Sequence, residues 1–358
     1  MNNHNLVVSI FRDHNQIFYA HNHMKIINVS ESSEKNWFWI NNHFKDQPHE
    51  WLNYTCHGYT ALKSLPKSES LGRVTAALQA CKKAREAPSI LVSHGHSLGL
   101  FTGFNSKIFC PETPQLAFTF SFTDLPQGEK RKLAILSAKQ PKKFVCSTTM
   151  EREVYSKHFE IPIEKIDMVH WSSEPPVIDP NMQPIEKGRY FCALGGQGRN
   201  YRVLIEAMKL LPDMKCVIVG TPSSLEGLTI PDNVKVYTNI PLKDAHNILH
   251  FSEFMVLPLR VAETPTGHMT IVSSMFFKKA ILVSDLNYVY DYVDDGKTGL
   301  FFEHDNPKDL KQKIAELWEN PENTVAMNDS AFAFAQEHCT EQGAVNYFKK
   351  FLLEYGSA

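Results

Sequence analysis

The second half of the chain alternates short apolar runs with amphipathic segments of helical length. Residues 216–219 and 280–283 contain no polar side chain, which is typical of parallel strands that are buried on both faces. We expect strands at 189–194, 215–220, 234–237, 254–258, 280–284 and 299–302. We expect helices at 201–211, 242–251, 267–277 and 307–319. This alternation predicts a doubly wound parallel sheet, whose ligands bind beyond the carboxyl ends of the strands.

The first half of the chain is less regular. We expect strands at 6–11, 25–29, 90–93, 116–122 and 143–147, and helices at 72–87 and 151–159. Thr148 and Glu151 have the spacing of a capping box at the start of the second helix. Residues 174–184 hold several prolines and no periodic apolar pattern, so this segment is interpreted as a linker between two domains.

Length, composition and charge restrict the class of protein. A chain of 358 residues is long enough for two domains with separate cores. The net charge of −2 gives no global electrostatic reason to expect nucleic acid as a partner. Seven cysteines without a Cys-x-x-Cys pair indicate reduced core residues of a cytoplasmic protein. The chain has no apolar run of about 18 residues, so we expect no membrane-spanning helix.

Two short basic clusters, at 129–132 and 139–143, interrupt this even charge distribution. They are interpreted either as a solvated surface or as a contact with anionic lipid headgroups. The second interpretation would put a cytoplasmic protein peripherally at the inner face of the membrane.

The most informative stretch runs from Phe191 to Ala207, where an apolar strand leads through a glycine-rich turn into an amphipathic helix. Gly195, Gly196 and Gly198 allow a tight turn and a close approach of the backbone to a ligand. The helix start offers unpaired N–H groups, and Arg199 adds a permanent cation with forked donors. Together they predict a binding site for a diphosphate.

A second anion site is predicted where the strand at 254–258 is followed by another helix start. Thr266, Gly267 and His268 follow Pro265 and would direct backbone N–H groups toward the strand ends. An ordinary capped helix is the alternative. Two anion sites that face one ligand indicate an enzyme that handles a nucleoside diphosphate.

The two stretches together resemble the retaining family-4 group of GT-B glycosyltransferases, the glycosyl transferases group 1. The family's Gly-Gly-x-x-Arg-Asp-Tyr stretch is matched at 195–201, and its Ser-Gly-Gln-x-x-x-x-Glu-Ala-Met stretch at 266–275. Residues 294–302, Asp-Asp-Gly-Lys-Thr-Gly-Leu-Phe-Phe, are similar to a third family motif. The resemblance covers roughly residues 188–318.

This resemblance implies an α/β fold of GT-B architecture, with two facing Rossmann-like domains and a deep cleft between them. The N-terminal, acceptor-side domain would span 1–176, the linker 177–186 and the nucleotide-sugar-binding domain 187–340, with a C-terminal helix at 343–356 packed back on the first domain. The implied reaction moves a hexosyl group from a nucleoside diphosphate sugar to a hydroxyl of a glycan or a lipid-linked saccharide. It would retain the anomeric configuration and need neither a metal nor a cofactor, because helix N-termini and Arg199 would stabilise the leaving group.

The resemblance also implies a set of donor-binding residues. They are Gly195, Gly196, Gly198, Arg199, Arg260, Glu263, Thr266, Gly267, His268 and Ser273. Ser273 stands where the family usually has a glutamate that grips the ribose hydroxyls, and Leu194 stands where many members carry a phosphate-binding arginine. Glu263 and Arg260 are candidates to replace these groups, although Arg260 could also be a solvent-facing loop residue.

Three residues of the first half are catalytic candidates by the same resemblance. His94 and His96 form a His-x-His pair after an apolar strand. Hydrogen bonding in the cleft, structural histidines and a metal site are the alternatives for this pair, and no third ligand indicates a metal. Asp124 is kept from the family's His-Asp-x-x-Pro motif, while Thr123 replaces its histidine. The Asp124 carboxylate would stabilise positive charge at the reacting sugar or orient the acceptor hydroxyl, unless it is a turn or capping residue.

The N-terminal segment departs most from the family. Residues 12–15, Arg-Asp-His-Asn, stand where the family has a glycine-rich loop, which indicates divergent handling of the acceptor. Aromatic side chains could stack on an acceptor sugar or belong to the core; these are Trp37, Phe38, Trp39 and Trp51. The changes at Leu194, Thr123 and Ser273 leave a catalytically silent GT-B subunit that binds a partner or a glycan as an alternative, and a nucleotide-sugar epimerase of the same architecture is another.

Overall fold

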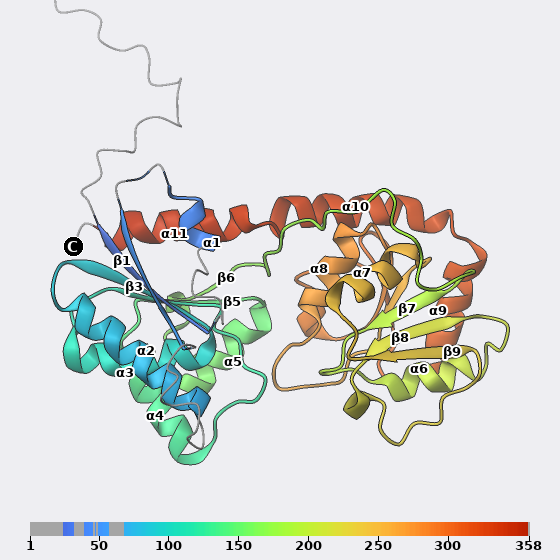
Figure 1. Ribbon diagram of the computed structural model, residues 1–358. Coiled ribbons are helices and arrows are strands. Elements are labelled where there is room, and N and C mark those ends of the chain that lie inside the picture. The colour runs from blue at the N-terminus through green and yellow to red at the C-terminus, as the bar shows by residue number, and fades with distance from the viewer. Residues whose placement is uncertain (1–23, 32–38, 46, 48, 57–67, 357–358) are drawn as a thin grey trace, which may run out of the picture.

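The computed structural model describes residues 24–31, 39–45, 47, 49–56 and 68–356. Within these residues the chain forms two α/β domains, each built around a six-stranded parallel sheet (Figure 1). The strand orders are β2-β1-β3-β4-β5-β6 and β12-β11-β10-β7-β8-β9. The predicted doubly wound α/β fold with two Rossmann-like domains is confirmed.

The N-terminal domain contains the first half of the described elements. Its strands are β1 Lys25–Ser30, β2 Glu50–Thr55, β3 Ser89–His94, β4 Gln115–Phe118, β5 Lys143–Cys146 and β6 Ile166–Met168. Its helices are α1 Trp39–Asn42, α2 Ser68–Ala84, α3 His96–Phe109, α4 Gly128–Ala138 and α5 Thr149–Phe159. The predicted strand at 6–11 lies outside the described residues.

The C-terminal domain follows the predicted alternation closely. Its strands are β7 Phe191–Leu194, β8 Cys216–Gly220, β9 Val234–Thr238, β10 Met255–Leu257, β11 Ile281–Ser284 and β12 Leu300–Phe302. Its helices are α6 Tyr201–Met208, α7 Leu242–Phe251, α8 His268–Phe276, α9 Pro307–Glu319 and α10 Asn323–His338. The strands β7, β8, β10 and β11 are buried over almost their whole length, as their apolar sequences predict.

One strand ends earlier than its sequence predicts. The apolar run at 116–122 was expected to be a single strand, but β4 ends at Phe118 because Thr119 has a φ of 55°. This left-handed residue turns the chain so that the N–H of Phe120 donates to the carbonyl of Val145 at 2.7 Å. The following loop, residues 119–127, therefore leaves the sheet at the carboxyl end of β4.

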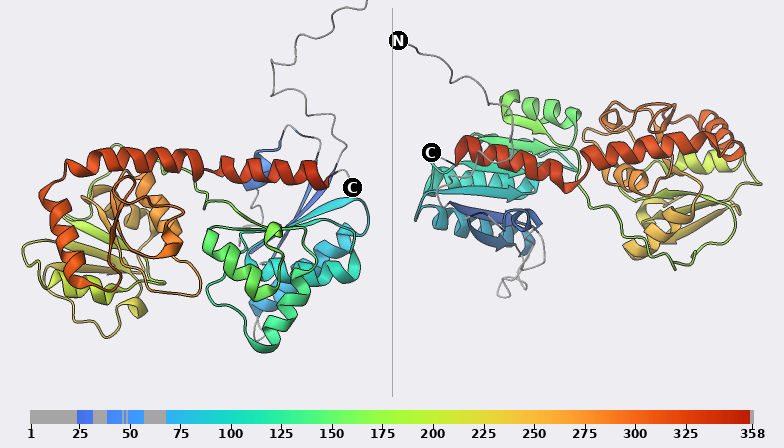
Figure 2. Two further views of the ribbon diagram at one scale, coloured as in Figure 1. Left: turned by 180° about the vertical axis from the view of Figure 1, so that it is seen from behind. Right: turned by 90° about the horizontal axis from the view of Figure 1, so that it is seen from above.

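The chain passes between the domains twice. Residues 169–190 run from the first domain to the second, and the junction of α10 with α11, Glu341–Tyr355, runs back (Figures 1 and 2). The apolar face of α11 packs into the core of the N-terminal sheet, where Phe348 and Phe351 join Ile26 and Val145. The two crossings are hydrogen-bonded to each other, since the N–H of Ser173 donates to the carbonyl of Cys339 at 2.9 Å.

Candidate active site

The glycine-rich turn after β7 is packed tightly against its neighbours. Gly195 and Gly198 have φ values of 105° and 70°, a region that side chains with a Cβ rarely adopt. A Cβ on Gly195 would collide with the Arg199 guanidinium, and a Cβ on Gly198 would collide with the Thr266 side chain. Gly196 meets Thr221 in the same way. The glycines therefore let the turn fold over Arg199 and against the start of α8.

Arg199 is buried, whereas a cation that binds the diphosphate directly is expected to be exposed. Only 4% of the residue is accessible to solvent. Its Nε donates to the Leu194 carbonyl at 2.9 Å, its Nη1 to the Gln197 carbonyl at 2.9 Å and its Nη2 to Thr270 Oγ1 at 2.8 Å. Burial lowers the pKa of the guanidinium from its ordinary value. Arg199 thus links the glycine-rich turn to α8 through hydrogen bonds. A direct bond from Arg199 to a phosphate stays a prediction.

The two predicted anion sites form one continuous surface. The N–H of Arg260 donates to the Gly198 carbonyl at 2.9 Å, and the N–H of Asn200 donates to the Pro258 carbonyl at 2.8 Å. The surface lies beyond β7 and β10, which are neighbours in the middle of the sheet. From β7 the strand order runs through β8 to β9 in one direction, and from β10 it runs through β11 to β12 in the other. This reversal of strand order is the position at which doubly wound sheets bind their ligands.

His268 is the first residue of α8, in the second of the two predicted anion sites. Gly267 precedes the helix with a φ of 95° and has no side chain to cap it. The His268 ring stacks on Tyr292 at 6.2 Å and contacts the Trp171 ring at 5.5 Å between centroids. Burial, and next the charge of Arg199, lower the pKa of His268 to about 4. The ring is therefore neutral at pH 7, and its buried Nδ1 has no hydrogen-bond partner among the described residues.

The remaining candidates for donor binding are Arg260, Glu263 and Ser273. Arg260 is exposed, and its Nε donates to the Arg199 carbonyl at 2.8 Å. Glu263 is exposed as well. The Ser273 hydroxyl donates to the Met269 carbonyl of its own helix at 2.9 Å. The only hydrogen-bond donor of the Ser273 side chain is therefore used within α8, and Ser273 cannot bind two ribose hydroxyls as a carboxylate does.

The His-x-His pair lies at the carboxyl end of β3. His94 is 4% exposed, its ring packs edge-on against Phe118, and burial lowers its pKa to about 3. His96 begins α3, contacts the Phe122 ring at 4.5 Å and also has a pKa lowered chiefly by burial. Both rings are neutral at pH 7. No group of three or more His, Cys, Asp or Glu side chains that could hold a metal occurs in the described part of the chain.

The loop that carries Thr123 and Asp124 reaches the donor side of the other domain. Gln197 Nε2 donates to Thr123 Oγ1 at 3.0 Å, and Thr264 Oγ1 donates to the Thr123 carbonyl at 2.7 Å. Asp124 is exposed beside this contact. It does not emerge directly from the strand, as was expected, because β4 ends at Phe118. Thr123 therefore touches both anion-binding segments, which brings Asp124 next to them.

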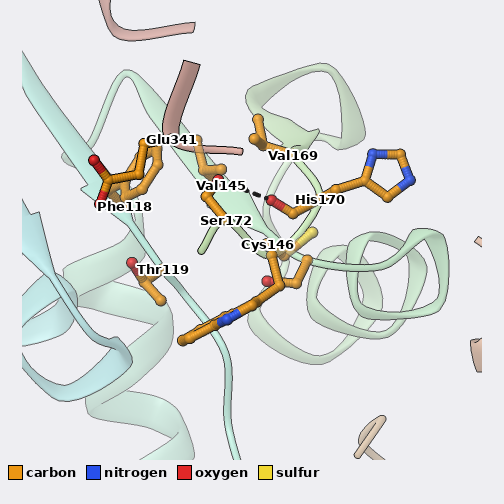
Figure 3. Close-up of a pocket in the computed structure, with 10 residues that line it drawn as sticks. Phe118, Thr119, Val145, Cys146, Val169, His170, Ser172 and Glu341 are labelled. Atoms are coloured by element: carbon orange, nitrogen blue, oxygen red, sulfur yellow. Dashed lines mark hydrogen bonds between the residues drawn. The ribbon is translucent and has the colours of Figure 1, made fainter. Parts of the chain in front are cut away.

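A cavity of about 200 Å³ lies beyond the carboxyl ends of β4, β5 and β6 (Figure 3). Its lining includes Trp171 and Ser172 from the first crossing and Glu341 from the start of α11. No local motif marks these residues in the sequence. Trp171 could have been suspected only as an isolated aromatic residue near the proline-rich linker.

The aromatic residues that were considered for an acceptor fall elsewhere. Trp51 packs against Phe44 and Phe348, with ring centroids 5.9 Å and 5.8 Å away, and so belongs to the core under α11. Residues 12–15, Trp37 and Phe38 lie outside the described residues, and the Trp39 side chain is likewise not described.

Comparisons with known proteins agree with the geometry of the C-terminal domain. Residues 187–333 match the family model described as glycosyl transferases group 1. The uncharacterized glycosyltransferase MJ1178 of Methanocaldococcus jannaschii is 28% identical over 147 residues, which cover 38% of this chain and 41% of the relative. The chain thus matches about two fifths of the length of that relative.

Solved structures share the fold of nearly the whole chain. A glycosyltransferase from Rickettsia africae ESF-5 has a TM-score of 0.69 at 15% identity, covering 94% of this chain and 99% of its own. Anabaena Alr3699/HepE, solved in complex with UDP-glucose, has a TM-score of 0.68 at 14% identity, covering 93% and 100%. Sucrose-phosphate synthase from Thermosynechococcus elongatus has a TM-score of 0.69 at 12% identity, covering 94% and 100%. Residues 187–333 thus match the glycosyl transferases group 1 family model, and the chain as a whole shares the two-domain α/β fold of these solved structures.

Proposed function

We propose that this protein is a glycosyltransferase that moves a hexosyl group from a nucleoside diphosphate sugar to a hydroxyl of a glycan or a lipid-linked saccharide. The observation that carries the proposal is the continuous surface of the two glycine-rich segments beyond β7 and β10. It presents the starts of α6 and α8, where unpaired N–H groups and the helix dipoles favour a diphosphate. The contacts of Thr123 with Gln197 and Thr264 bring the other domain to the same surface.

The chemistry that these groups offer is stabilisation of a leaving diphosphate. Fixed N–H dipoles stabilise charge where it develops, without reorganisation at the moment of reaction. The neutral His268 ring can give or accept one hydrogen bond at the start of α8. Asp124, beside the contact between the domains, is the proposed carboxylate for the reacting sugar or the acceptor hydroxyl. Retention of the anomeric configuration and independence of metal ions belong to the proposal through the family resemblance.

UDP is the first nucleotide to test, because HepE was solved with UDP and with UDP-glucose. The purified protein would be unfolded by heat with UDP, GDP or ADP present. At a concentration of about 100 times the dissociation constant, a ligand stabilises the protein by about 2.7 kcal/mol. A stabilising nucleotide would then be used, as its radioactive hexose conjugate, in transfer and hydrolysis assays. The absence of a shift with every nucleoside diphosphate would contradict the proposal.

A catalytically silent subunit is the second candidate, and one observation favours it. The Ser273 hydroxyl is bonded within its own helix, so nothing at this position grips a ribose as the usual glutamate does. This alternative predicts that a nucleotide or glycan binds while neither transfer nor hydrolysis of the donor occurs. The same binding and turnover measurements therefore separate the two functions.

We also propose that one face of the N-terminal domain rests against anionic lipid. Phe104 and Ile108 of α3 and Leu133 and Leu136 of α4 are between 41% and 59% exposed. The two helices cross closely, since the Ser137 carbonyl leaves no room for a Cβ on Gly103. Exposed lysines accompany these apolar side chains, and they complement anionic headgroups; they are Lys107, Lys130, Lys132 and Lys139. No helix in the described ranges is long and apolar enough to cross a bilayer.

The membrane contact is tested with vesicles. We expect the protein to float with vesicles of phosphatidylglycerol and phosphatidylcholine, to float less at high salt, and to stay behind with phosphatidylcholine alone. The double variant Leu133→Asp, Leu136→Asp should lose binding. Leu210→Asp, which changes an equally exposed leucine of the C-terminal domain, is the control. Equal flotation of both variants would contradict this contact.

A further inference from the structure

We infer that the cavity beyond β4, β5 and β6 binds a single uncharged sugar ring, and that this ring belongs to the acceptor. The inference rests on the proposed glycosyl transfer. The cavity lies where parallel strands present their carboxyl ends, which is where doubly wound sheets hold ligands. Thr119 follows β4, and Glu341 comes from α11 (Figure 3). Ser147 follows β5, and Trp171 follows β6 by a short connection.

The lining combines the two kinds of surface that a sugar presents. Phe118, Val145 and Val169 form apolar walls, and the Trp171 indole adds a flat aromatic face for the C–H side of a ring. Hydroxyl and carboxylate groups also line the cavity, where they can bond to sugar hydroxyls; they belong to Thr119, Ser147, Ser172 and Glu341. Ser172 Oγ donates to the His170 carbonyl at 3.3 Å, so Ser172 offers a sugar hydroxyl an acceptor. A few placed polar groups in a mainly apolar hollow are typical of small-molecule sites.

The volume of the cavity and the charge of its lining restrict the class of ligand that it can bind. A cavity of about 200 Å³ is smaller than the roughly 300–1,000 Å³ of sites for drug-sized ligands, so it holds one ring and no nucleotide. The Glu341 carboxylate opposes a phosphate. The His170 imidazole points away from the cavity in Figure 3, and its Nε2 contacts the Asp291 carbonyl at 2.9 Å. Burial lowers the pKa of this ring, so His170 supplies no cation to an anionic ligand.

The groups of the cavity are held in place before a ligand arrives. The backbone N–H of Trp171 donates to Tyr292 Oη at 2.8 Å, and Glu341 Oε2 lies 3.1 Å from His43 Nε2. Thr119 is a β-branched residue in the left-handed region, with a φ of 55°. Residues in this conformation are strained and gather at functional sites. The strained residue lines the cavity and begins the loop that carries Thr123 and Asp124.

The position of Trp171 explains why the ring belongs to the acceptor. Its indole lies 5.5 Å from the His268 ring, which begins α8 at the proposed diphosphate site. A sugar stacked on Trp171 would therefore lie beside the donor, with the loop of Asp124 reaching both. Trp171 and Glu341 are the proposed residues that determine acceptor specificity.

The experiment measures binding of free monosaccharides by saturation-transfer-difference NMR, with UDP present and absent. Glucose, galactose, mannose and N-acetylglucosamine are the probes. We expect at least one of them to receive saturation from the wild-type protein, and its affinity to fall at least about tenfold in Trp171→Ala and in Glu341→Gln. Trp318→Ala is the matched control, because Trp318 packs under the Arg189 guanidinium in the other domain. UDP affinity should stay within about twofold in all three variants.

Each outcome decides between the claims. Sugar signals that are unchanged in Trp171→Ala, or the absence of signals from all four sugars with folded wild-type protein, would overturn the cavity as a sugar site. Glu341→Gln keeps the shape of the side chain, so it tests the cavity even if Trp171→Ala fails to fold. A protein that binds a sugar through Trp171 but binds no nucleoside diphosphate would overturn the proposed transferase and leave the sugar site standing.

Discussion

Replacing Arg199 with alanine should destabilise the protein strongly, although an exposed cation at a ligand would predict almost no effect on folding. The guanidinium is buried and bonds to the Leu194 carbonyl, the Gln197 carbonyl and Thr270 Oγ1. In Arg199→Ala the Leu194 carbonyl stays buried without a donor, which costs about 1–3 kcal/mol. The other two bonds contribute about 0.5–1.5 kcal/mol each, because their acceptors can reach water.

The sum is about 2–6 kcal/mol before one opposing effect is counted. The Arg199 guanidinium has no carboxylate partner among the described residues, so its burial costs free energy, and its removal returns part of that cost. We therefore expect Arg199→Ala to lower the free energy of unfolding by about 2–4 kcal/mol, a large share of the 5–15 kcal/mol of a typical domain. Arg199→Lys should recover only part of the loss, because an ammonium group cannot reproduce the planar fork.

The assay is urea unfolding of the ligand-free protein at pH 7, followed by calorimetric titration of UDP into the folded variants. Arg260→Ala is the control, because this exposed side chain donates its Nε to the Arg199 carbonyl at 2.8 Å and its removal should lower the free energy of unfolding by less than about 1 kcal/mol. If Arg199→Ala is as stable as Arg260→Ala and loses only UDP affinity, the buried role is refuted. The guanidinium would then act on the phosphate directly.

Three further predictions concern the site. Asp124→Asn should lower turnover by roughly 10²-fold with little change in donor affinity and melting temperature, whereas a turn residue would lower only the melting temperature. His268 has a pKa of about 4 in the fold and about 6.5 when unfolded, so stability should fall as the pH drops from 6.5 to 4, by up to about 1.4 kcal/mol per pH unit. Urea midpoints at pH 7, 6 and 5 should show a flatter dependence for His268→Asn, and an unchanged slope would argue against the buried neutral ring. Transfer activity should survive excess chelator, and a loss that manganese or magnesium restores would count against the metal-independent mechanism.

The hydrophobic periodicity of the chain was sufficient to predict a helix or strand where the local sequence and the packing favour the same structure. The helices α7 and α9 occupy the residues predicted for them, and α9 begins after Asn306, whose side chain accepts from the N–H groups of Lys308 and Asp309. The strands β8 and β11 were evident because a strand covered on both faces must be apolar throughout. The short strand β2 was missed, because its sequence mixes polar and apolar residues and all six are only partly buried.

The end of β4 is set by a contact that the periodic pattern does not contain. Apolar residues recur from Leu116 to Phe122, interrupted by Thr119 and Ser121, and nothing local distinguishes Thr119 from a strand residue. The turn at Thr119 depends on a hydrogen bond from Phe120 to Val145 of the neighbouring strand. A contact with a residue that is distant in the chain cannot be recovered from a periodic pattern.

The sequence by itself determined which chemical groups the donor surface contains, because glycine turns and helix starts are local features that adjacent residues define. Only the tertiary structure decided the direction of each side chain. It buried Arg199 between two segments and brought the Trp171 ring of the first crossing against the His268 ring at the start of α8. The physical reason is that a side chain's exposure and partners depend on packing between segments distant in the chain, and residue type and spacing do not specify that packing.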